Sequence, residues 1–243
     1  MARFMLVHGA FYGAWCWEPL IAELAAAGHT AHALDLPGSG DDPTPVDAVT
    51  LDAYAERICG RLAEQPEPVT LVGHSMGGVA ITQAAARRPE QIGRLVYVAA
   101  FLPADGQSLA DLAALPEGAG DGMQANMVVE GDPPVATMPQ DAAREVFYGE
   151  CEPEQTTWAL ERLRGQPVVP FVTPVALGAN GGGPAAAYVV AAQDRAIPPA
   201  LQRRMAAEGG ATDVVEVDTD HSPFLSRTAE LAAILERFAT AAT

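Results

Sequence analysis

A serine framed by glycines is the first feature of this sequence that could do chemistry. Ser75 lies in the stretch LVGHSMGGVA, after a predicted strand and before a predicted helix. A serine on such a turn can act as a nucleophile, because small residues at Gly73 and Gly77 leave room for the backbone and the helix N-terminus faces developing negative charge. The alternative interpretation is that Ser75 only caps the helix. The choice depends on its partners.

A serine nucleophile needs a base, and the sequence contains five histidines. His221 is the strongest candidate, because the segment DTDHSPF follows the last predicted strand and precedes the last helix. That position is the carboxyl edge of a parallel sheet, where active sites of α/β proteins form. The alternative is a histidine in a surface loop. The remaining histidines adjoin the serine or the first two predicted strands: His74, His8, His29 and His32.

The base needs a carboxylate that fixes its tautomer and stabilises its charged form. Asp194, in YVVAAQDRAIPP, follows the penultimate predicted strand and completes the chain order Ser, Asp, His. Asp218 and Asp220 are close sequence neighbours of His221 and are therefore poorly placed to face its ring. Asp105, after the fourth predicted strand, is the remaining rival.

Acyl transfer also requires two backbone N–H groups that stabilise the oxyanion. The amide of Met76, directly after the serine, can supply one of them. The loop VHGAFYGAW after the first predicted strand can supply the other, since Gly9 allows a close approach and Ala10 carries an amide. The alternative for this loop is a plain glycine turn.

The elements that would position these residues alternate between strand-like and helix-like patterns. Such alternation predicts a parallel sheet with crossover helices. The predicted strands cover residues 3–9, 29–38, 68–73, 93–101, 185–192 and 213–218, and the predicted helices cover residues 17–28, 51–65, 77–88, 199–210 and 228–242.

The alternation fails between residues 103 and 183, where Pro, Gly, Met and aromatic residues accumulate. We therefore predict a core formed by residues 1–102 and 184–243, with a cap or lid insertion over 103–183. Two cap helices are predicted, at 139–150 and 152–165, and a flexible stretch is predicted at 178–184.

Apolar and aromatic side chains of the cap and of the first loop are predicted to select the substrate. For any one of them, ordinary packing between cap and core is the alternative. The predicted pocket residues are Phe11, Tyr12, Met123, Phe147 and Trp158, and the wider set adds Met127, Met138, Tyr148, Leu160 and Phe171.

Composition limits the partners and the compartment. A chain of 243 residues suits one catalytic domain, and its 31 acidic against 14 basic residues would repel phosphate backbones and anionic lipids, which argues against nucleic-acid and membrane partners. The N-terminus has no signal-peptide pattern and no run reaches roughly 18 apolar residues, so no transmembrane segment is expected. The three cysteines, Cys16, Cys59 and Cys151, form no C-x-x-C pair and are predicted to be free thiols in a reducing cytoplasm rather than zinc ligands.

Several stretches resemble the α/β-hydrolase superfamily, in the branch of plant methylesterases, plant hydroxynitrile lyases and their bacterial esterase relatives. They span nearly the whole chain: LVHGAFYGAWCWEPL, LVGHSMGG, YVAAFLP, YVVAAQDRAIPPALQRRM and DHSPFL. The resemblance implies a mostly parallel central sheet with flanking helices and an inserted cap, and an enzyme that needs no cofactor or metal. It also implies Ser75 as nucleophile, Asp194 and His221 as its triad partners, and Ala10 and Met76 as oxyanion donors.

Two departures within this branch favour ester hydrolysis over carbon–carbon lysis. The similar lyases carry a lysine directly after the catalytic histidine and a threonine in the first-strand loop, whereas this sequence has Ser222 and Gly9. Epoxide hydrolases and haloalkane dehalogenases of this fold use an aspartate nucleophile. This sequence has Ser75 at that position, which argues against both activities.

We therefore predict a methylesterase-like carboxylesterase that cleaves small, largely apolar or aromatic esters through an acyl-enzyme. A lactonase, thioesterase or cyclase of secondary metabolism remains an alternative on the same residues. A hydroxynitrile lyase-like enzyme and a small-molecule receptor that kept the fold are two others. Dimers are common among relatives of this kind, so a homodimer is possible.

Overall fold

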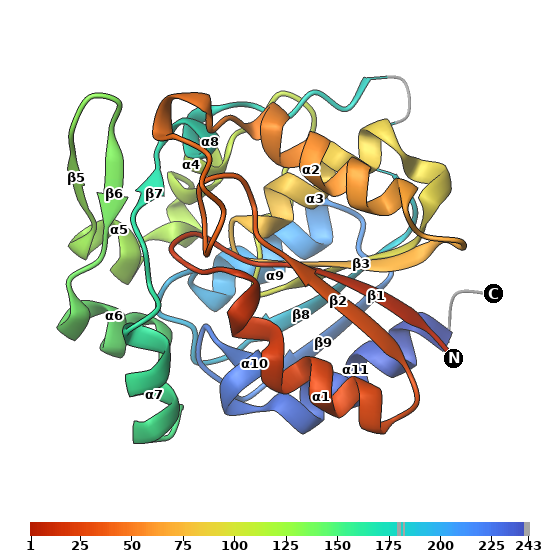
Figure 1. The fold of residues 1–243 in the computed structure, drawn as a ribbon. Helices are drawn as coiled ribbons and strands as arrows, with labels where there is room; N and C mark the ends of the chain where they lie inside the picture. The colour runs from red at the N-terminus through yellow and green to blue at the C-terminus, as the bar shows by residue number, and fades with distance from the viewer. Residues whose placement is uncertain (179–180, 182, 241–243) are drawn as a thin grey trace.

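A six-stranded parallel sheet forms the centre of the molecule (Figure 1). The computed structural model describes residues 1–178, 181 and 183–240. The strand order β2-β1-β3-β4-β8-β9 confirms the predicted α/β architecture, with every pairing parallel. The strands are β1 (Arg3–Val7), β2 (Thr30–Leu34), β3 (Val69–His74), β4 (Ile92–Val98), β8 (Ala186–Ala191) and β9 (Asp213–Val217).

Helices cover both faces of this sheet. In Figure 1, α1 and α11 lie below it and α2 and α3 above it. The inner strands β3 and β8 are buried along their whole length, which explains their continuous apolar runs. The core helices are α1 (Glu18–Ala26), α2 (Leu51–Ala63), α3 (Gly77–Arg87), α9 (Pro199–Glu208), α10 (Pro223–Ser226) and α11 (Thr228–Thr240), and short 3₁₀ helices cover Ala14–Trp17, Val46–Ala48, Pro89–Gln91 and Pro116–Gly118.

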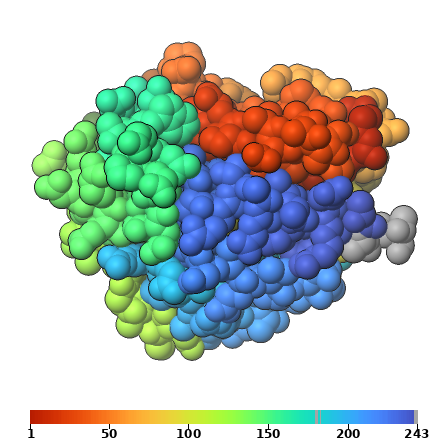
Figure 2. Space-filling view, turned by 90° about the horizontal axis from the view of Figure 1, so that it is seen from below, coloured from red at the N-terminus to blue at the C-terminus, as the bar shows by residue number. Residues whose placement is uncertain are grey.

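The described chain between β4 and β8 forms a second, smaller layer, which we call the cap segment (residues 103–178, 181 and 183). Its three-stranded antiparallel sheet lies beside the core, and the space-filling view shows the green cap segment packed against the blue C-terminal segment (Figure 2). Its elements are α4 (Leu109–Ala113), α5 (Gly122–Asn126), β5 (Val128–Glu130), β6 (Val135–Thr137), α6 (Gln140–Phe147), α7 (Pro153–Leu160), β7 (Gln166–Pro167) and α8 (Val169–Val172). The division into a core and a separate cap domain stays a prediction.

The cap segment differs from the sequence prediction at the end of one predicted helix and in the short helices and strands that were not predicted, which are α4, α5, β5, β6, β7 and α8. Helix α7 ends at Leu160 rather than at residue 165. Beyond it, the N–H of Arg164 bonds to the C=O of Phe11, and Gln166 pairs with Ala136. These tertiary bonds outweigh the helical pattern. Strand β5 was not predicted, because all three of its residues are exposed and lack the apolar alternation of a half-buried strand.

Three other expectations either differ from the structure or include residues outside the described chain. Strand β2 ends at Leu34 rather than at residue 38. Residues 179, 180 and 182 of the predicted flexible stretch, and residues 241–242 of the predicted last helix, lie outside the described residues. In the part of the chain that the structure describes, no helix has the length and apolar character needed to cross a membrane.

Candidate active site

The predicted site residues follow four strands that all end at one edge of the sheet. Val7 of β1 lies opposite Gly73 of β3, so the loops after these strands leave the sheet at the same level. Gly9 consequently lies against the serine: a Cβ built on Gly9 would stand 2.7 Å from the Cβ of Ser75. The acid and base loops leave the adjacent strands β8 and β9, where Ala191 pairs with the end of β9.

Ser75 occupies a strained position on the turn between β3 and α3. Its φ of 54° is in the left-handed region, which costs a non-glycine residue free energy and is typical of functional sites. The flanking glycines are required by close approach: a Cβ on Gly73 would stand 2.8 Å from the Gly77 oxygen, and one on Gly77 would stand 2.6 Å from the His8 oxygen. The turn therefore holds the serine at the start of α3, as expected for a nucleophile.

The predicted base and acid form a buried hydrogen-bonded pair. His221 Nδ1 lies 2.8 Å from Asp194 Oδ2, and the two residues are 1% and 5% exposed. Asp194 Oδ1 also accepts the N–H groups of Ala196 (2.7 Å) and Ile197 (3.0 Å), and its Oδ2 accepts Gln202 Nε2–H (2.8 Å). With the carboxylate held in this way, the proton of His221 belongs on Nδ1, and Nε2 is left as an acceptor.

The rival carboxylates bond elsewhere. Asp105 is exposed and accepts the N–H of Leu177, in the cap segment. Asp218 is exposed and accepts the side-chain amide of Gln193. Asp220 is buried, but it accepts backbone N–H groups of Glu150 and Ser222 rather than a ring nitrogen of His221.

Two backbone amides near Ser75 are free to bind an anion. The N–H groups of Ala10 and Met76 have no hydrogen-bond partner among the described residues. Met76 lies at the N-terminus of α3, where unpaired N–H groups and the helix dipole favour negative charge. The residues on either side of Ala10 are anchored: His8 Nδ1–H donates to the Gly9 C=O at 2.7 Å, and the Phe11 C=O accepts from the cap segment. Because a trans peptide is planar, the Ala10 N–H points away from His8.

Two buried histidines complete the site, and the sequence analysis missed their roles. His74 Nε2–H donates to the backbone C=O of His221 at 2.8 Å, and the two rings are 4.6 Å apart. His8 accepts the N–H of Leu36 on its other ring nitrogen. Burial lowers the pKa of both His8 and His74, so folding favours the neutral form of both rings. Their place at the ends of two buried strands was the only signal in the sequence.

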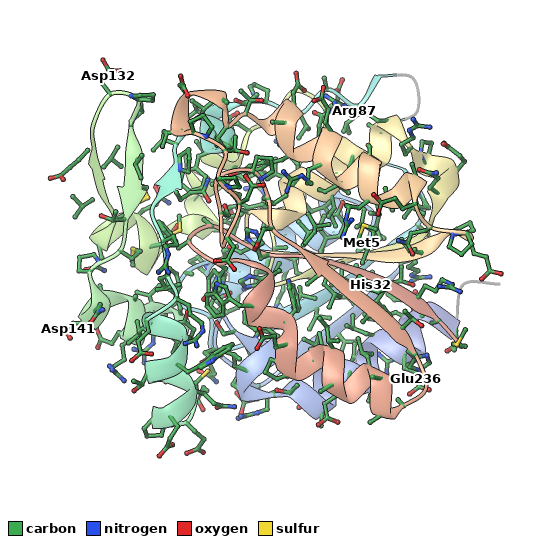
Figure 3. The ribbon with its side chains drawn as sticks, viewed as in Figure 1. Met5, His32, Arg87, Asp132, Asp141 and Glu236 are labelled. Atoms are coloured by element: carbon green, nitrogen blue, oxygen red, sulfur yellow. The ribbon has the colours of Figure 1, made fainter. Side chains whose placement is uncertain are left out.

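The two other histidines lie away from this edge. His32 lies on β2, where Figure 3 labels it, and is exposed. His29 lies 3.3 Å from Glu236, a residue of α11 that is also labelled there. Neither residue follows a strand at the edge that holds Ser75, so His221 stays the candidate base.

Lower pH should destabilise the fold through His8 and His74. The imidazole of each titrates near 6.5 in the unfolded chain and at a lower pH in the folded one, so below 6.5 the unfolded state binds more protons. The free energy of unfolding should then fall by about 1.4 kcal/mol per pH unit for each histidine until its folded pKa is reached.

Urea unfolding at several values between pH 7 and pH 5 measures this dependence. His74→Gln should reduce the slope by one histidine's share, whereas the matched control His32→Gln, at an exposed position, should leave it unchanged. An unaltered slope in His74→Gln would contradict the assignment.

The predicted pocket residues divide into two groups. Phe147 lies 5.6 Å from the His221 ring and 6.0 Å from the Phe11 ring, measured between centroids. Tyr12 packs on Phe147 at 5.9 Å and on His74 at 5.4 Å. These three aromatic side chains therefore gather at the predicted triad.

The other two pocket candidates have different neighbours. Trp158 is half-buried, with its ring against Trp15 (5.2 Å) and the guanidinium of Arg162 (4.7 Å). Met123 is buried in α5, next to Gly122, whose N–H bonds to the C=O of Arg195 in the acid loop. In the ring contacts of the described residues, Trp158 does not pack on His221.

Two positions, Ser222 and Gly9, differ from the similar lyases, and the structure shows the surroundings of both. The Ser222 hydroxyl lies 3.0 Å from the Tyr12 hydroxyl, both in the buried interior. At Gly9, a threonine would bring its Cβ within 2.9 Å of His74 Nδ1 as well as within 2.7 Å of the Ser75 Cβ. This backbone thus leaves no space for the lyase-type residue. No group of three or more metal-binding side chains gathers in the described residues.

Comparison of the sequence with known proteins identifies the family that it matches. The profile of the alpha/beta hydrolase family matches residues 4–234. Putative methylesterase 14, chloroplastic, of Arabidopsis thaliana is 31% identical over 96% of this chain and 70% of its own length. Esterase PIR7B of Oryza sativa subsp. japonica is 32% identical over 98% of this chain and 95% of its own.

Solved structures agree closely with the fold. A pyrethroid hydrolase from Sphingobium faniae JZ-2 superposes with a TM-score of 0.90 at 27% identity, covering 99% of this chain and 98% of that one. Polyneuridine aldehyde esterase superposes with a TM-score of 0.87 at 26% identity, covering 98% of each chain. The similarity therefore extends over both the core and the cap segment.

Proposed function

Because the chain belongs to the alpha/beta hydrolase family and is an esterase-type enzyme of it, we propose that it is a serine esterase acting on small, largely apolar or aromatic carboxylic esters. The observation that carries the proposal is the buried pair of His221 and Asp194, 2.8 Å apart, at the sheet edge that also holds the strained Ser75. The aromatic side chains around His221 support an apolar substrate.

The reaction runs in two halves. In the first, His221 Nε2 takes the proton of Ser75 as Oγ attacks the ester carbonyl, and the amides of Ala10 and Met76 bind the oxyanion. The intermediate collapses to an acyl-enzyme, and the alcohol leaves with the proton from His221. In the second half a water molecule gives a proton to His221 and attacks the acyl carbon. As this second intermediate collapses, His221 returns the proton to Ser75 Oγ and the acid leaves.

Hydrolysis is favoured over lyase chemistry by the residue after His221. A departing cyanide would need a nearby positive charge, and Ser222 offers only a hydroxyl that already bonds to Tyr12. Its buried neighbours provide no ammonium group in the described contacts.

A panel of esters tests the proposed function. Purified protein is assayed with p-nitrophenyl and methyl esters that carry short aliphatic or aromatic acyl groups, with Ser75→Ala protein as the blank. Turnover of these esters by the wild type alone is the expected result. Cleavage of a cyanohydrin to cyanide without ester turnover would overturn the proposal in favour of a lyase.

His74 should act as a positioning residue that works through His221. His74→Phe keeps a ring but removes the N–H that holds the His221 carbonyl, so kcat should fall about 100-fold with little change in KM. His74→Gln can still donate and should recover part of kcat. Equal kcat values for the two variants would indicate that His74 only fills space.

The compartment and the assembly state remain proposals. Cys16, Cys59 and Cys151 are free thiols, which suits a reducing cytoplasm. A homodimer is compatible with this fold, and light scattering of the purified chain would measure its mass.

A further inference from the structure

A hollow of about 320 Å³ opens between the cap segment and the loop after β1, which carries Ala10 and Phe11. We call it the cap hollow. Its lining comes from the end of α7 and the chain after it, from the chain around the start of α6, and from Phe11 of the loop after β1. The apolar lining residues are Phe11, Met138, Leu160 and Leu163, and the polar ones are Thr137, Gln140 and Arg164.

A thin aromatic layer separates this hollow from the candidate triad. Phe11 forms part of the hollow's wall and is only 2% exposed. Its ring lies 6.0 Å from the ring of Phe147, which in turn lies 5.6 Å from the ring of His221. Phe11 therefore stands between the hollow and the aromatic ring that packs beside His221, the base that would activate Ser75.

The backbone of Phe11 is fixed, whereas its side chain is held only by packing. The Phe11 C=O accepts the Arg164 N–H at 2.9 Å, and the Gly9 C=O on the other side of Ala10 accepts from His8. A shift of this loop would move the Ala10 amide that binds the oxyanion. Access through the layer must therefore come from rotation of the Phe11 side chain, a motion that leaves the amide in place.

The charges of the hollow indicate what it can bind. Arg164 is its one charged lining residue in the described chain, and Nη1 of that guanidinium already donates to the C=O groups of Glu161 and Leu163. In the described chain no carboxylate lines the hollow, although the chain has 31 acidic residues. Apolar side chains, beside a guanidinium that bonds to backbone carbonyls, suit an aliphatic or aromatic group.

We propose that the cap hollow binds the larger apolar part of the ester and that the Phe11 side chain is the gate between this subsite and Ser75. This inference rests on the proposed function, because it concerns the substrate of the same site. It makes Phe11 a specificity-determining residue whose backbone and side chain have separate tasks.

The test compares two series of esters on three variants. One series lengthens the acyl group of a methyl ester, from acetate to octanoate, and the other enlarges the alcohol of an acetate ester, so both series begin at methyl acetate. Met138→Trp fills the hollow from its half-exposed wall, and Phe11→Ala removes the gate while keeping a Cβ on the same backbone. Val172→Trp is the matched control, since Val172 is 57% exposed on α8 and does not line the hollow.

Met138→Trp should lower kcat/KM for the large members of one series about ten-fold and change that for methyl acetate less than about two-fold. Phe11→Ala should raise kcat/KM for the same large esters about ten-fold, and Val172→Trp should behave as the wild type. If Phe11→Ala does not fold, as judged by circular dichroism, Met138→Trp decides alone.

The outcomes separate the two proposals. Ser75-dependent hydrolysis with an unchanged size preference in Met138→Trp would overturn the subsite and leave the esterase in place. Equal losses for small and large esters would also overturn it. Absence of any Ser75-dependent hydrolysis would overturn the proposed function and the subsite together.

Discussion

Ser75→Ala protein should lose about 10⁵-fold in kcat on any ester that the wild type hydrolyses, because no other group can form the acyl-enzyme. The fold should survive, since alanine keeps the Cβ and adopts the φ of 54° at a strain similar to that of serine. Stopped or continuous assays with p-nitrophenyl esters measure the loss, and circular dichroism checks the fold.

His221→Ala should cost about as much as Ser75→Ala, and the double variant should be no slower than either single one. The two residues perform one step, so removing the second adds nothing once the first is gone. Additive losses would mean that Ser75 and His221 act independently, and retained turnover in Ser75→Ala would remove Ser75 from the reaction.

Asp194→Asn should reduce kcat about 10⁴-fold. The carboxylate accepts only from N–H donors, those of Ala196, Ile197, Gln202 and His221. An asparagine NH₂ must face at least one of these donors, which displaces a hydrogen bond or drives the His221 proton to Nε2. In either case the histidine no longer accepts the serine proton.

The same substitution should also lower the free energy of unfolding by about 2 kcal/mol, because a buried donor loses its acceptor. Urea unfolding and ester assays on one preparation measure both effects. Asp218→Asn is the control, since Asp218 is exposed and its partner Gln193 can rotate to suit an amide. If Asp194→Asn kept the wild-type kcat, the carboxylate that orients His221 would have to be another residue.

The order of the core elements could be predicted because each depends on a local pattern. Apolar runs such as 68–73 and amphipathic spacing such as 51–65 are properties of neighbouring residues, and the structure has β3 and α2 there. The candidate site followed from one geometric rule: carboxyl ends of parallel strands share an edge. This rule brought Ser75 and the pair of Asp194 and His221 to the same place from distant parts of the chain.

The cap segment was harder to predict because its structure depends on partners far away in sequence. The end of α7 is decided by the bond from Arg164 to Phe11, and strand β5 has no buried face. The position of Phe147 beside His221 and that of Trp158 beside Trp15 could not be separated, since both are aromatic residues on short amphipathic helices. Only the packing of cap against core distinguishes them.

By itself the sequence determined the α/β order, the strand ends that carry Ser75, Asp194 and His221, and the absence of a lysine after the last of these. It could do so because periodicity and motif spacing are local. The tertiary structure alone decided that His74 holds the His221 carbonyl and that Arg164 of the cap segment holds the Phe11 carbonyl. Both are hydrogen bonds between segments that only folding brings together, and no pattern of neighbouring residues specifies them.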